Sequence, residues 1–239
     1  VTAFLSVVSK GVMAFVLLSV LYVTFSKLAE VWYAAICFFA IVSMIGGNLF
    51  AIRQNNLKRF LAFSSIAQVG YVLIGISGSS QSGMSSVIFF LLVYVCSNLA
   101  AFAVINLVSA ATSREKITDL KGFHASNPAL AWVMAIALFS LAGIPPTAGF
   151  FGKFFLLTAG ASKWNAPVLI IAALNMVVSL YYYLRVIRSM FMESSSEPML
   201  KLSSSGPVRL ALLVCITGIL ALGFYSPAYE WIRSISFGL

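Results

Sequence analysis

Two lysines, Lys10 and Lys153, stand inside long apolar segments, and they are the side chains of this sequence best suited to chemistry inside a membrane. An ammonium group at bilayer depth costs about 2.5–3.5 kcal/mol on insertion scales, so such a lysine is by default a functional residue facing protein or water. Desolvation disfavours the charged form of lysine, which lets a buried lysine gain and lose a proton, whereas arginine stays charged. We therefore predict that both lysines relay protons. For Lys10 the alternative is that its long side chain reaches back to the membrane surface.

The segment around Lys153 contains two adjacent prolines between glycines. Prolines remove backbone donors and interrupt a helix, and irregular backbone persists at membrane depth where protein or a cavity satisfies it. Residues 128–160 would span about 50 Å as one helix, too long for a single crossing of a core about 30 Å thick. We expect a broken span here, and a broken helix with a buried charge is typical of a transport site. The residues of the predicted break are Gly143, Pro145, Pro146, Gly149 and Gly152.

The composition excludes an ordinary soluble domain. The 239 residues are 61% hydrophobic and 9% charged, which predicts a polytopic helical membrane protein. A net charge of +9 would suggest nucleic acid in a soluble protein, but the basic residues cluster in short loops. We therefore expect the lipid bilayer as a partner and no nucleic acid.

Cofactor motifs are missing from the sequence. Cys37, Cys96 and Cys215 lie in three different apolar runs without metal-binding spacing, and we interpret them as buried apolar residues. The sequence has no glycine-rich phosphate loop and no histidine or cysteine cluster for haem or iron–sulfur. We expect no cofactor and no metal in this chain.

The apolar runs predict an all-α transmembrane bundle of about seven spans in a single membrane domain, residues 1–239. The predicted spans are residues 2–25, 31–52, 60–77, 84–110, 128–160, 168–190 and 208–225, with the break inside the fifth. Alternate loops must lie on the same side, and the positive-inside rule makes the more basic side cytoplasmic. That side has Arg53, Lys58, Arg59, Arg114, Lys116, Lys121, Arg185, Arg188, Lys201 and Arg209, and the other has Lys27, Lys163 and Arg233.

Two polar stripes cross the third and fourth spans. Ser64, Gln68 and Tyr71 stand at i, i+4 and i+7, and Tyr94 and Asn98 stand at i and i+4. We expect both stripes to face the bundle interior, because lipid offers these groups no partners. They are either an internal water path between the lysines or the hydrogen bonds of helix packing.

The remaining polar residues are expected at the ends of the spans. Tyr181, Tyr182 and Tyr183 with Arg185 are typical of an aromatic belt with a basic anchor at the membrane surface. His124 is interpreted as a loop residue, with proton entry as the alternative. The carboxylates all map to loops or the tail: Glu30, Glu115, Asp119, Glu193, Glu197 and Glu230. We therefore expect the acidic partner of each lysine to lie outside this sequence, or the lysines to face water.

Four separated blocks resemble a known family in the same order along the chain. They are residues 1–10 (VTAFLSVVSK), 47–71 (GNLFAIRQNNLKRFLAFSSIAQVGY), 140–154 (SLAGIPPTAGFFGKF) and 181–185 (YYYLR). The chain is similar to subunit N of the proton-pumping NADH-quinone oxidoreductase, respiratory complex I, one of its antiporter-like subunits. Such subunits have fourteen helices in two inverted repeats. The resemblance implies that this sequence holds the eighth to fourteenth helices and that the first seven, with an acidic partner, lie upstream.

The resemblance also implies roles for the two lysines. Lys10 matches the lysine of the family's central axis, and Lys153 matches the lysine of its broken helix near the proton exit. Tyr94 and Asn98 stand where the L-type subunit has a histidine and a lysine, so a relay there would depend on water. Lysine rather than glutamate at position 153 argues against the M-type subunit.

The function implied by the resemblance is proton translocation driven by quinone reduction elsewhere in a complex. FMN, iron–sulfur clusters and quinone would then belong to other subunits, and the partners would be neighbouring membrane subunits. The expected location is the bacterial plasma (inner) membrane, with an organellar membrane as the alternative. Two rival functions are a subunit of a multisubunit sodium/proton antiporter and a purely structural membrane subunit.

Overall fold

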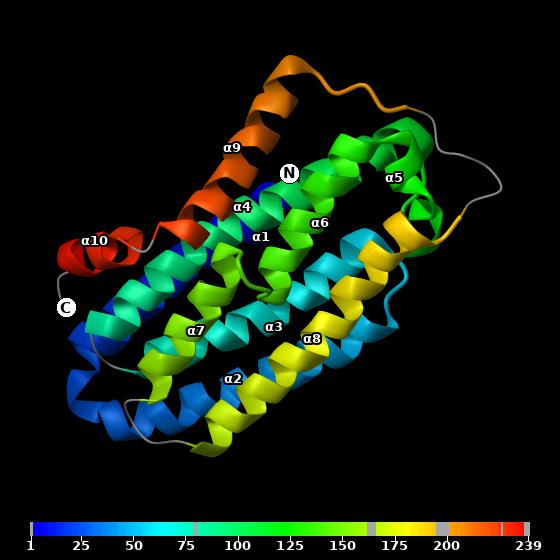
Figure 1. Cartoon of the computed structure of the whole chain (residues 1–239). Helices are drawn as coiled ribbons and strands as arrows, with labels where there is room; N and C mark the ends of the chain where they lie inside the picture. Colours follow the sequence, from blue (N-terminus) through cyan, green and yellow to red (C-terminus); the bar gives the residue numbers. More distant parts are fainter. Residues whose placement is uncertain (1, 79–80, 162–165, 195–200, 226, 237–239) are drawn as a thin grey trace.

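The structure, a computed structural model, is a bundle of long helices (Figure 1) and describes residues 2–78, 81–161, 166–194, 201–225 and 227–236. Lys163 and Glu197, which the sequence placed in loops, lie outside the described residues. The helices are α1 (Thr2–Ser19), α2 (Ala29–Arg53), α3 (Leu57–Ser77), α4 (Gln81–Thr112), α5 (Phe123–Ser126), α6 (Pro128–Ala142), α7 (Ala148–Ala161), α8 (Ala166–Met192), α9 (Gly206–Phe224) and α10 (Pro227–Ile235). Short helical turns cover Val20–Thr24, Ser26–Leu28 and Ile117–Leu120.

The predicted all-α transmembrane bundle is confirmed. Within the described residues, six helical stretches are long and apolar enough to cross a membrane, and α6 with α7 supplies one further, broken crossing. The predicted ends lie within a few residues of the observed ones. One detail was not predicted: α1 continues as a π-helical turn over Val20–Thr24.

The helix break lies where the prolines and glycines predicted it. α6 ends at Gly143, whose φ of +84° lies in the left-handed region that favours glycine, and its N–H donates to the carbonyl of Phe139 at 2.9 Å. α7 then packs against the end of α6 so closely that a Cβ on Gly149 would lie 1.8 Å from the carbonyl oxygen of Ser140. These two glycines therefore allow the two half-helices to turn and to touch. Pro145 and Pro146 themselves are exposed.

The central helix of the bundle is α3. It packs against α2, α4 and α7 (Figure 1), and its residues from Gly70 to Ser77 are buried. By contrast, α1, α2, α8 and α9 expose large apolar side chains along their outer faces, as lipid-facing helices do. The helix α3, which bears the stripe of Ser64, Gln68 and Tyr71, can therefore bring the two lysines into contact with the same residues.

One end of the bundle gathers the basic connections. The α2–α3 connection, the segment between α4 and α6, and the end of α8 meet there (Figure 1). Glu115 accepts hydrogen bonds from Lys58 at 2.5 Å, Asn56 at 2.9 Å and Ser109 at 2.9 Å. These bonds, with Lys58 as the largest contribution, lower the pKa of the Glu115 carboxyl to about 2. The cluster ties together the end of the bundle that the basic loops predict to be cytoplasmic.

Candidate functional site

Lys153 is buried in the angle of the broken helix. The side chain comes from α7 and is 0% exposed, and its Nζ donates to the carbonyl oxygens of Leu141 at 2.7 Å and Ala142 at 3.1 Å. These two residues end α6, where carbonyls lack partners within the helix and the helix dipole is negative. The ammonium of Lys153 therefore sits on the C-terminal end of a half-helix. Among the described residues, no carboxylate pairs with it.

An aromatic ring and a glycine also border the site where the Lys153 ammonium contacts the end of α6, which we call the Lys153 seat. Nζ of Lys153 lies 5.0 Å from the ring centroid of Tyr71 on α3, a distance at which a ring face attracts a cation. A Cβ on Gly143 would lie 3.1 Å from Cδ of Lys153 and 2.8 Å from Cε of Met176, so glycine also makes room for the lysine stem. A Cβ on Gly152 would lie 3.1 Å from the ring of Phe90. Of the glycines of the predicted break, Gly143 thus adjoins the lysine side chain, whereas Gly149 and Gly152 allow close packing against Ser140 and Phe90.

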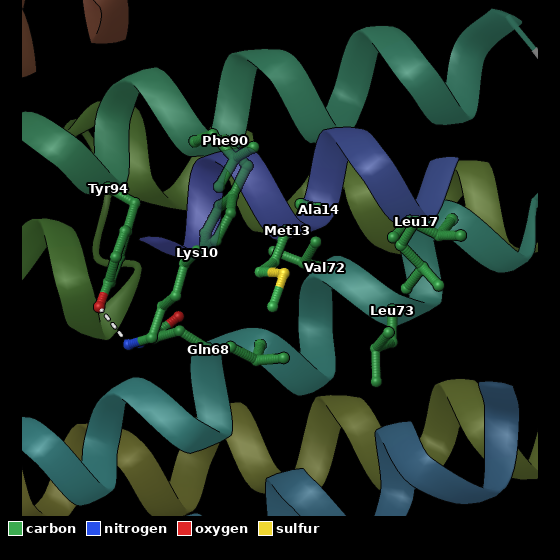
Figure 2. Close-up of a pocket in the computed structure, with 12 residues that line it drawn as sticks. Lys10, Met13, Ala14, Leu17, Gln68, Val72, Leu73, Phe90 and Tyr94 are labelled. Atoms are coloured by element: carbon green, nitrogen blue, oxygen red, sulfur yellow. Dashed lines mark hydrogen bonds between the residues drawn. The ribbon is translucent and has the colours of Figure 1, made fainter. Parts of the chain in front are cut away.

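Lys10 occupies a different environment on α1. Its Nζ donates to the hydroxyl of Tyr94 at 3.1 Å and lies 5.3 Å from the centroid of the same ring (Figure 2). One turn away, Asn98 donates to Oγ of Ser6 at 2.6 Å, which holds α1 against α4. The side chain of Lys10 therefore points into the bundle, and the alternative that it reaches back to the membrane surface is wrong.

A cavity of about 120 Å³ lies beside Lys10, between α1, α3 and α4 (Figure 2). Its polar lining consists of Lys10, Gln68 and Tyr94, and its remaining lining residues are apolar. A cavity of this size holds several water molecules if they find polar partners. Such a cavity borders Lys10, whereas the carbonyl seat of Lys153 is packed.

Gln68 connects the two lysine sites. It is 2% exposed, lines the Lys10 cavity, and donates through Nε2 to the carbonyl of Leu141 at 3.0 Å and to the hydroxyl of Tyr183 at 3.2 Å. The Leu141 carbonyl is the one that also accepts from Lys153. One side chain of α3 therefore borders Lys10 on one side and shares an acceptor with Lys153 on the other.

The predicted polar stripes face inward, but their members do different things. Ser64, Gln68, Tyr71, Tyr94 and Asn98 are all nearly or fully buried. The hydroxyl of Ser64 donates back to its own helix at Leu61 O, and that of Tyr71 donates to Ala172 O on α8. The Ser64 bond satisfies the hydroxyl within α3, and the Tyr71 bond joins α3 to α8. Gln68 and Tyr94 are the stripe residues whose polar groups touch a lysine or its acceptor.

The aromatic-belt prediction is wrong for two of the three tyrosines. Tyr182 and Tyr183 are 0% exposed, and only Tyr181 of the three, at 62%, faces outward. Tyr182 donates to Asn48, which itself donates to Asn175, while Tyr183 meets Gln68. The spacing of Asn175, Ser179 and Tyr182 at i, i+4 and i+7 was the available signal for this inward face.

Arg185 binds the end of a neighbouring helix, and its role as an anchor at the membrane surface stays a prediction. Its guanidinium donates to the carbonyls of Ile52 and Gln54, which close the C-terminus of α2. The arginine thus satisfies carbonyls that a helix end leaves free.

The other candidate groups lie away from the lysines. The ring of His124, on α5, packs 4.6 Å from that of Phe191, at the basic end of the bundle. Cys37 and Cys215 are buried, Cys96 is half-buried, and none of the three forms a disulfide within the described residues. Within the described residues, no group of three or more His, Cys, Asp or Glu side chains is placed to hold a metal ion.

Comparison with known proteins places this arrangement in a family. Residues 1–181 match the family model described as "NADH:quinone oxidoreductase/Mrp antiporter, TM". The chain belongs to this family. Along its whole length it is 48% identical to NADH-quinone oxidoreductase subunit N of Azobacteroides pseudotrichonymphae, of which it covers 50%. The chain thus spans about half the length of the curated relatives it matches.

Solved structures agree with the fold. A chain of respiratory complex I from Thermus thermophilus matches 86% of this chain with a TM-score of 0.72 and 29% identity, over 46% of its own length. A chain of the Mrp complex from Dietzia sp. matches 95% of this chain with a TM-score of 0.83, over 50% of its own length. At 18% identity the second match concerns the fold alone.

Proposed function

We propose that this chain forms part of a proton-translocating membrane subunit of an NADH:quinone oxidoreductase. The observation that carries the proposal is the fully buried Lys153, whose Nζ sits on two carbonyls at the end of a broken helix. A relative named subunit N of that enzyme, at 48% identity over the whole chain, supports the same reading. The subunit would translocate protons without redox chemistry of its own.

The seat of Lys153 suits a residue that changes protonation state. Protonated, its ammonium is attracted by the negative end of α6 and donates to the carbonyls of Leu141 and Ala142. The neutral amine loses the charge–dipole attraction but keeps two N–H groups, enough for the same two carbonyls. Both carbonyls keep a hydrogen bond whether the lysine is protonated or neutral. Loss of the proton therefore does not carry the additional free-energy cost of an unsatisfied buried carbonyl.

In this proposal Lys10 exchanges protons with water in its cavity, and Lys153 stores and releases a proton at the helix break. The glycines of the break would let the half-helices move. FMN, iron–sulfur clusters and quinone would belong to other subunits, with neighbouring membrane subunits as partners. The bacterial plasma membrane is the proposed location.

The test is proton transport by the complex that contains the full-length subunit. We expect Lys153→Met to lower the number of protons transported per NADH oxidised in reconstituted vesicles, because methionine keeps the length and cannot carry a proton. Lys27→Met is the matched control, since Lys27 is exposed on the short helical turn Ser26–Leu28 between α1 and α2. Unchanged transport in Lys153→Met would favour a purely structural subunit.

A second candidate is a subunit of a multisubunit sodium/proton antiporter, because the matching family model covers both kinds of complex. Isolation of the native complex separates the two. Recovery with flavin and iron–sulfur subunits and NADH oxidation supports the first proposal. Recovery with small antiporter subunits, with sodium-driven proton exchange and without NADH oxidation, supports the second.

A further inference from the structure

A cavity of about 840 Å³ lies between α4, α7, α9 and α10, and neither Lys10 nor Lys153 lines it. Its lining is mostly aromatic and includes Phe89 of α4, Phe154 of α7 and Tyr229 of α10. Sites for small molecules usually have volumes of roughly 300–1,000 Å³ and apolar walls. The cavity therefore has the size and the lining of a binding site.

The walls of this cavity are fixed by packing. The ring of Tyr229 stacks on that of Phe155 with centroids 3.9 Å apart, and Phe89 lies edge-on to both rings, at 5.9 and 5.4 Å. α10 is also bound to the start of α4, because Nε2 of Gln81 donates to the carbonyl of Ser236 at 2.9 Å. The cavity is thus a built feature of the fold.

One side of the cavity presents apolar rings to the surroundings of the bundle. Phe150 and Phe154 stack along α7 with centroids 6.2 Å apart, and Phe154 is 50% exposed. Phe224, at the end of α9, is 71% exposed. Because large apolar groups grouped in this way mark a site for an apolar partner, the ligand has an apolar portion.

The cavity also has one charged residue in its lining, Glu230 of α10. Its carboxylate lies 3.9 Å from the guanidinium of Arg233, which is one turn further along the same helix. Their side chains are 70% and 50% exposed, so both charged groups are open to a ligand. The edge of the cavity therefore presents a negative and a positive group next to each other.

This charged edge lies at the end of the bundle opposite the basic connections. α10 follows the C-terminal end of α9, and α9 begins on the side where α8 ends (Figure 1). Trp231 and Tyr225, which are 67% and 62% exposed, lie near the charged pair in the chain, and such residues are typical of the membrane surface. The charged groups are thus placed at the level of lipid headgroups and the phenylalanines at the level of acyl chains.

We propose that this cavity binds one phospholipid with an ethanolamine headgroup. Its ammonium binds the carboxylate of Glu230, its phosphate binds Arg233, and one acyl chain lies along Phe150 and Phe154. An ethanolamine headgroup has a cation and an anion in adjacent positions, as the Glu230–Arg233 pair requires. An ammonium also donates N–H groups to a carboxylate, which a quaternary choline cannot do, and the ring faces attract a cation. A glycerol headgroup would bring no cation to Glu230.

The lipid would join three helices next to the helix break. The end of α9 packs so closely on the break that a Cβ on Gly223 would lie 2.5 Å from the carbonyl oxygen of Pro146. The acyl chain would contact α7 directly after that break, on residues adjacent in sequence to Lys153. Binding of the lipid therefore holds α7, α9 and α10 in the packing that the structure shows.

The first test is photolabelling of the complete complex in vesicles of phosphatidylethanolamine and phosphatidylglycerol. A trace of phosphatidylethanolamine with a photoreactive group in its acyl chain should label residues 150–155, as identified by mass spectrometry of peptides. Glu230→Gln, which keeps the size and removes the charge, should lower this labelling about fivefold, the ratio expected for one lost hydrogen bond. Glu30→Gln is the matched control, because Glu30 is also an exposed carboxylate, at the start of α2, and does not line the cavity.

The choice of headgroup is tested with phosphatidylglycerol that has the same photoreactive acyl chain. This lipid should label residues 150–155 more weakly than phosphatidylethanolamine does, and to the same extent in the native complex and in Glu230→Gln. Equal labelling by the two lipids in the native complex would overturn the ethanolamine site, as would unchanged phosphatidylethanolamine labelling in Glu230→Gln.

The occupant is tested directly by electron cryomicroscopy of the native complex in the same lipid mixture. We expect density for an acyl chain along Phe150 and Phe154 and for a headgroup between Glu230 and Arg233. An empty cavity, or one filled by a segment of a neighbouring subunit, would overturn the proposal. None of these measurements follows proton transport, so the lipid site is decided independently of the result for Lys153→Met.

Discussion

The two lysine sites differ in what faces the ammonium group. Lys153 is enclosed by protein, and backbone carbonyls at a helix end hold its Nζ. Lys10 is less buried and has a single tyrosine hydroxyl as its observed partner, beside a cavity. The backbone carbonyls hold the Lys153 ammonium without water, and these contacts change only if the helix break moves. Lys10, with one side-chain partner beside a cavity, can also contact water. In the proposed function, this difference in geometry makes Lys153 the storage site and Lys10 the exchange site.

The largest effect is expected from closing the space between the half-helices at the Lys153 site. Gly149→Ala would place a Cβ 1.8 Å from the Ser140 carbonyl, which is backbone and cannot move aside without shifting α6. We expect a loss of about 3 kcal/mol or more of stability, at the upper end for overpacking. The measurement is the thermal unfolding of the complex in detergent, together with the yield of assembled subunit.

Gly46→Ala is the matched control for this change. A Cβ on Gly46 meets nothing within 4 Å, and the residue lies inside α2, so alanine should be neutral or stabilising by up to about 1 kcal/mol. Equal melting temperatures for Gly149→Ala and Gly46→Ala would show that Gly149 does not pack against the Ser140 carbonyl. The position of Lys153 against the end of α6 would then be wrong as well.

A smaller effect, confined to transport, is expected from the Lys10 site. Tyr94→Phe removes the hydroxyl that accepts from Lys10 at 3.1 Å and leaves the ring in place. A hydrogen bond to a charged group contributes about 1.5–3 kcal/mol, so we expect proton transport through this subunit to slow at least tenfold, measured as the initial rate of vesicle acidification.

Tyr71→Phe provides the comparison at the other lysine. Its ring lies 5.0 Å from Nζ of Lys153, but its hydroxyl bonds Ala172 O, so phenylalanine keeps the ring face and both carbonyl partners of the lysine. We expect a clearly smaller loss of transport than in Tyr94→Phe. The reverse order would mean that the backbone seat is not what holds the Lys153 ammonium.

The sequence predicted the positions of the lysines, the break and the inward stripes, because these depend on apolar run length, proline chemistry and helical period. It did not predict the acceptors of Lys153. Those are carbonyls of the preceding half-helix, and their place depends on the angle of the turn at Gly143, which side-chain types do not specify. A carboxylate partner outside this sequence stays a prediction, while the acceptors within the described residues are backbone carbonyls.

The tyrosines of α8 and Gln68 illustrate a second limit. Tyr182 and Tyr183 with a nearby arginine resemble a membrane anchor locally, and only the neighbouring helices show that they face inward. For Gln68 the helical spacing gave its face, but the direction of its amide depends on the Leu141 carbonyl, which is 73 positions further along the chain. Contacts between distant segments are set by packing, which local patterns do not encode.

The smallest effect is expected from Glu115→Gln, at the basic end of the bundle. This variant distinguishes acid sensitivity at that end from pH dependence that arises at the lysine sites. Because the pKa of Glu115 falls from 4.5 to about 2 on folding, its contribution to stability is fully present above about pH 4.5 and is lost as the pH falls toward 2. Glu115→Gln should therefore lower the melting temperature slightly above about pH 5 and leave it unchanged near pH 2, which flattens the decline between about pH 5 and 3. The effect is small, because the partly exposed pair with Lys58 is screened by solvent.

The control for this prediction is Glu230→Gln, because Glu230 lies on α10, away from the cluster around Glu115. Glu230 lies 3.9 Å from Arg233 on α10, an exposed pair that contributes little, so this variant should keep the acid-dependent decline of the native complex. Since the pKa of Glu115 lies well below neutrality, a change in proton transport between about pH 6 and 8 that survives in Glu115→Gln must come from other groups. A flattening of that neutral-range dependence in Glu115→Gln would instead place the transport titration at the bundle end and remove the functional distinction drawn between Lys10 and Lys153.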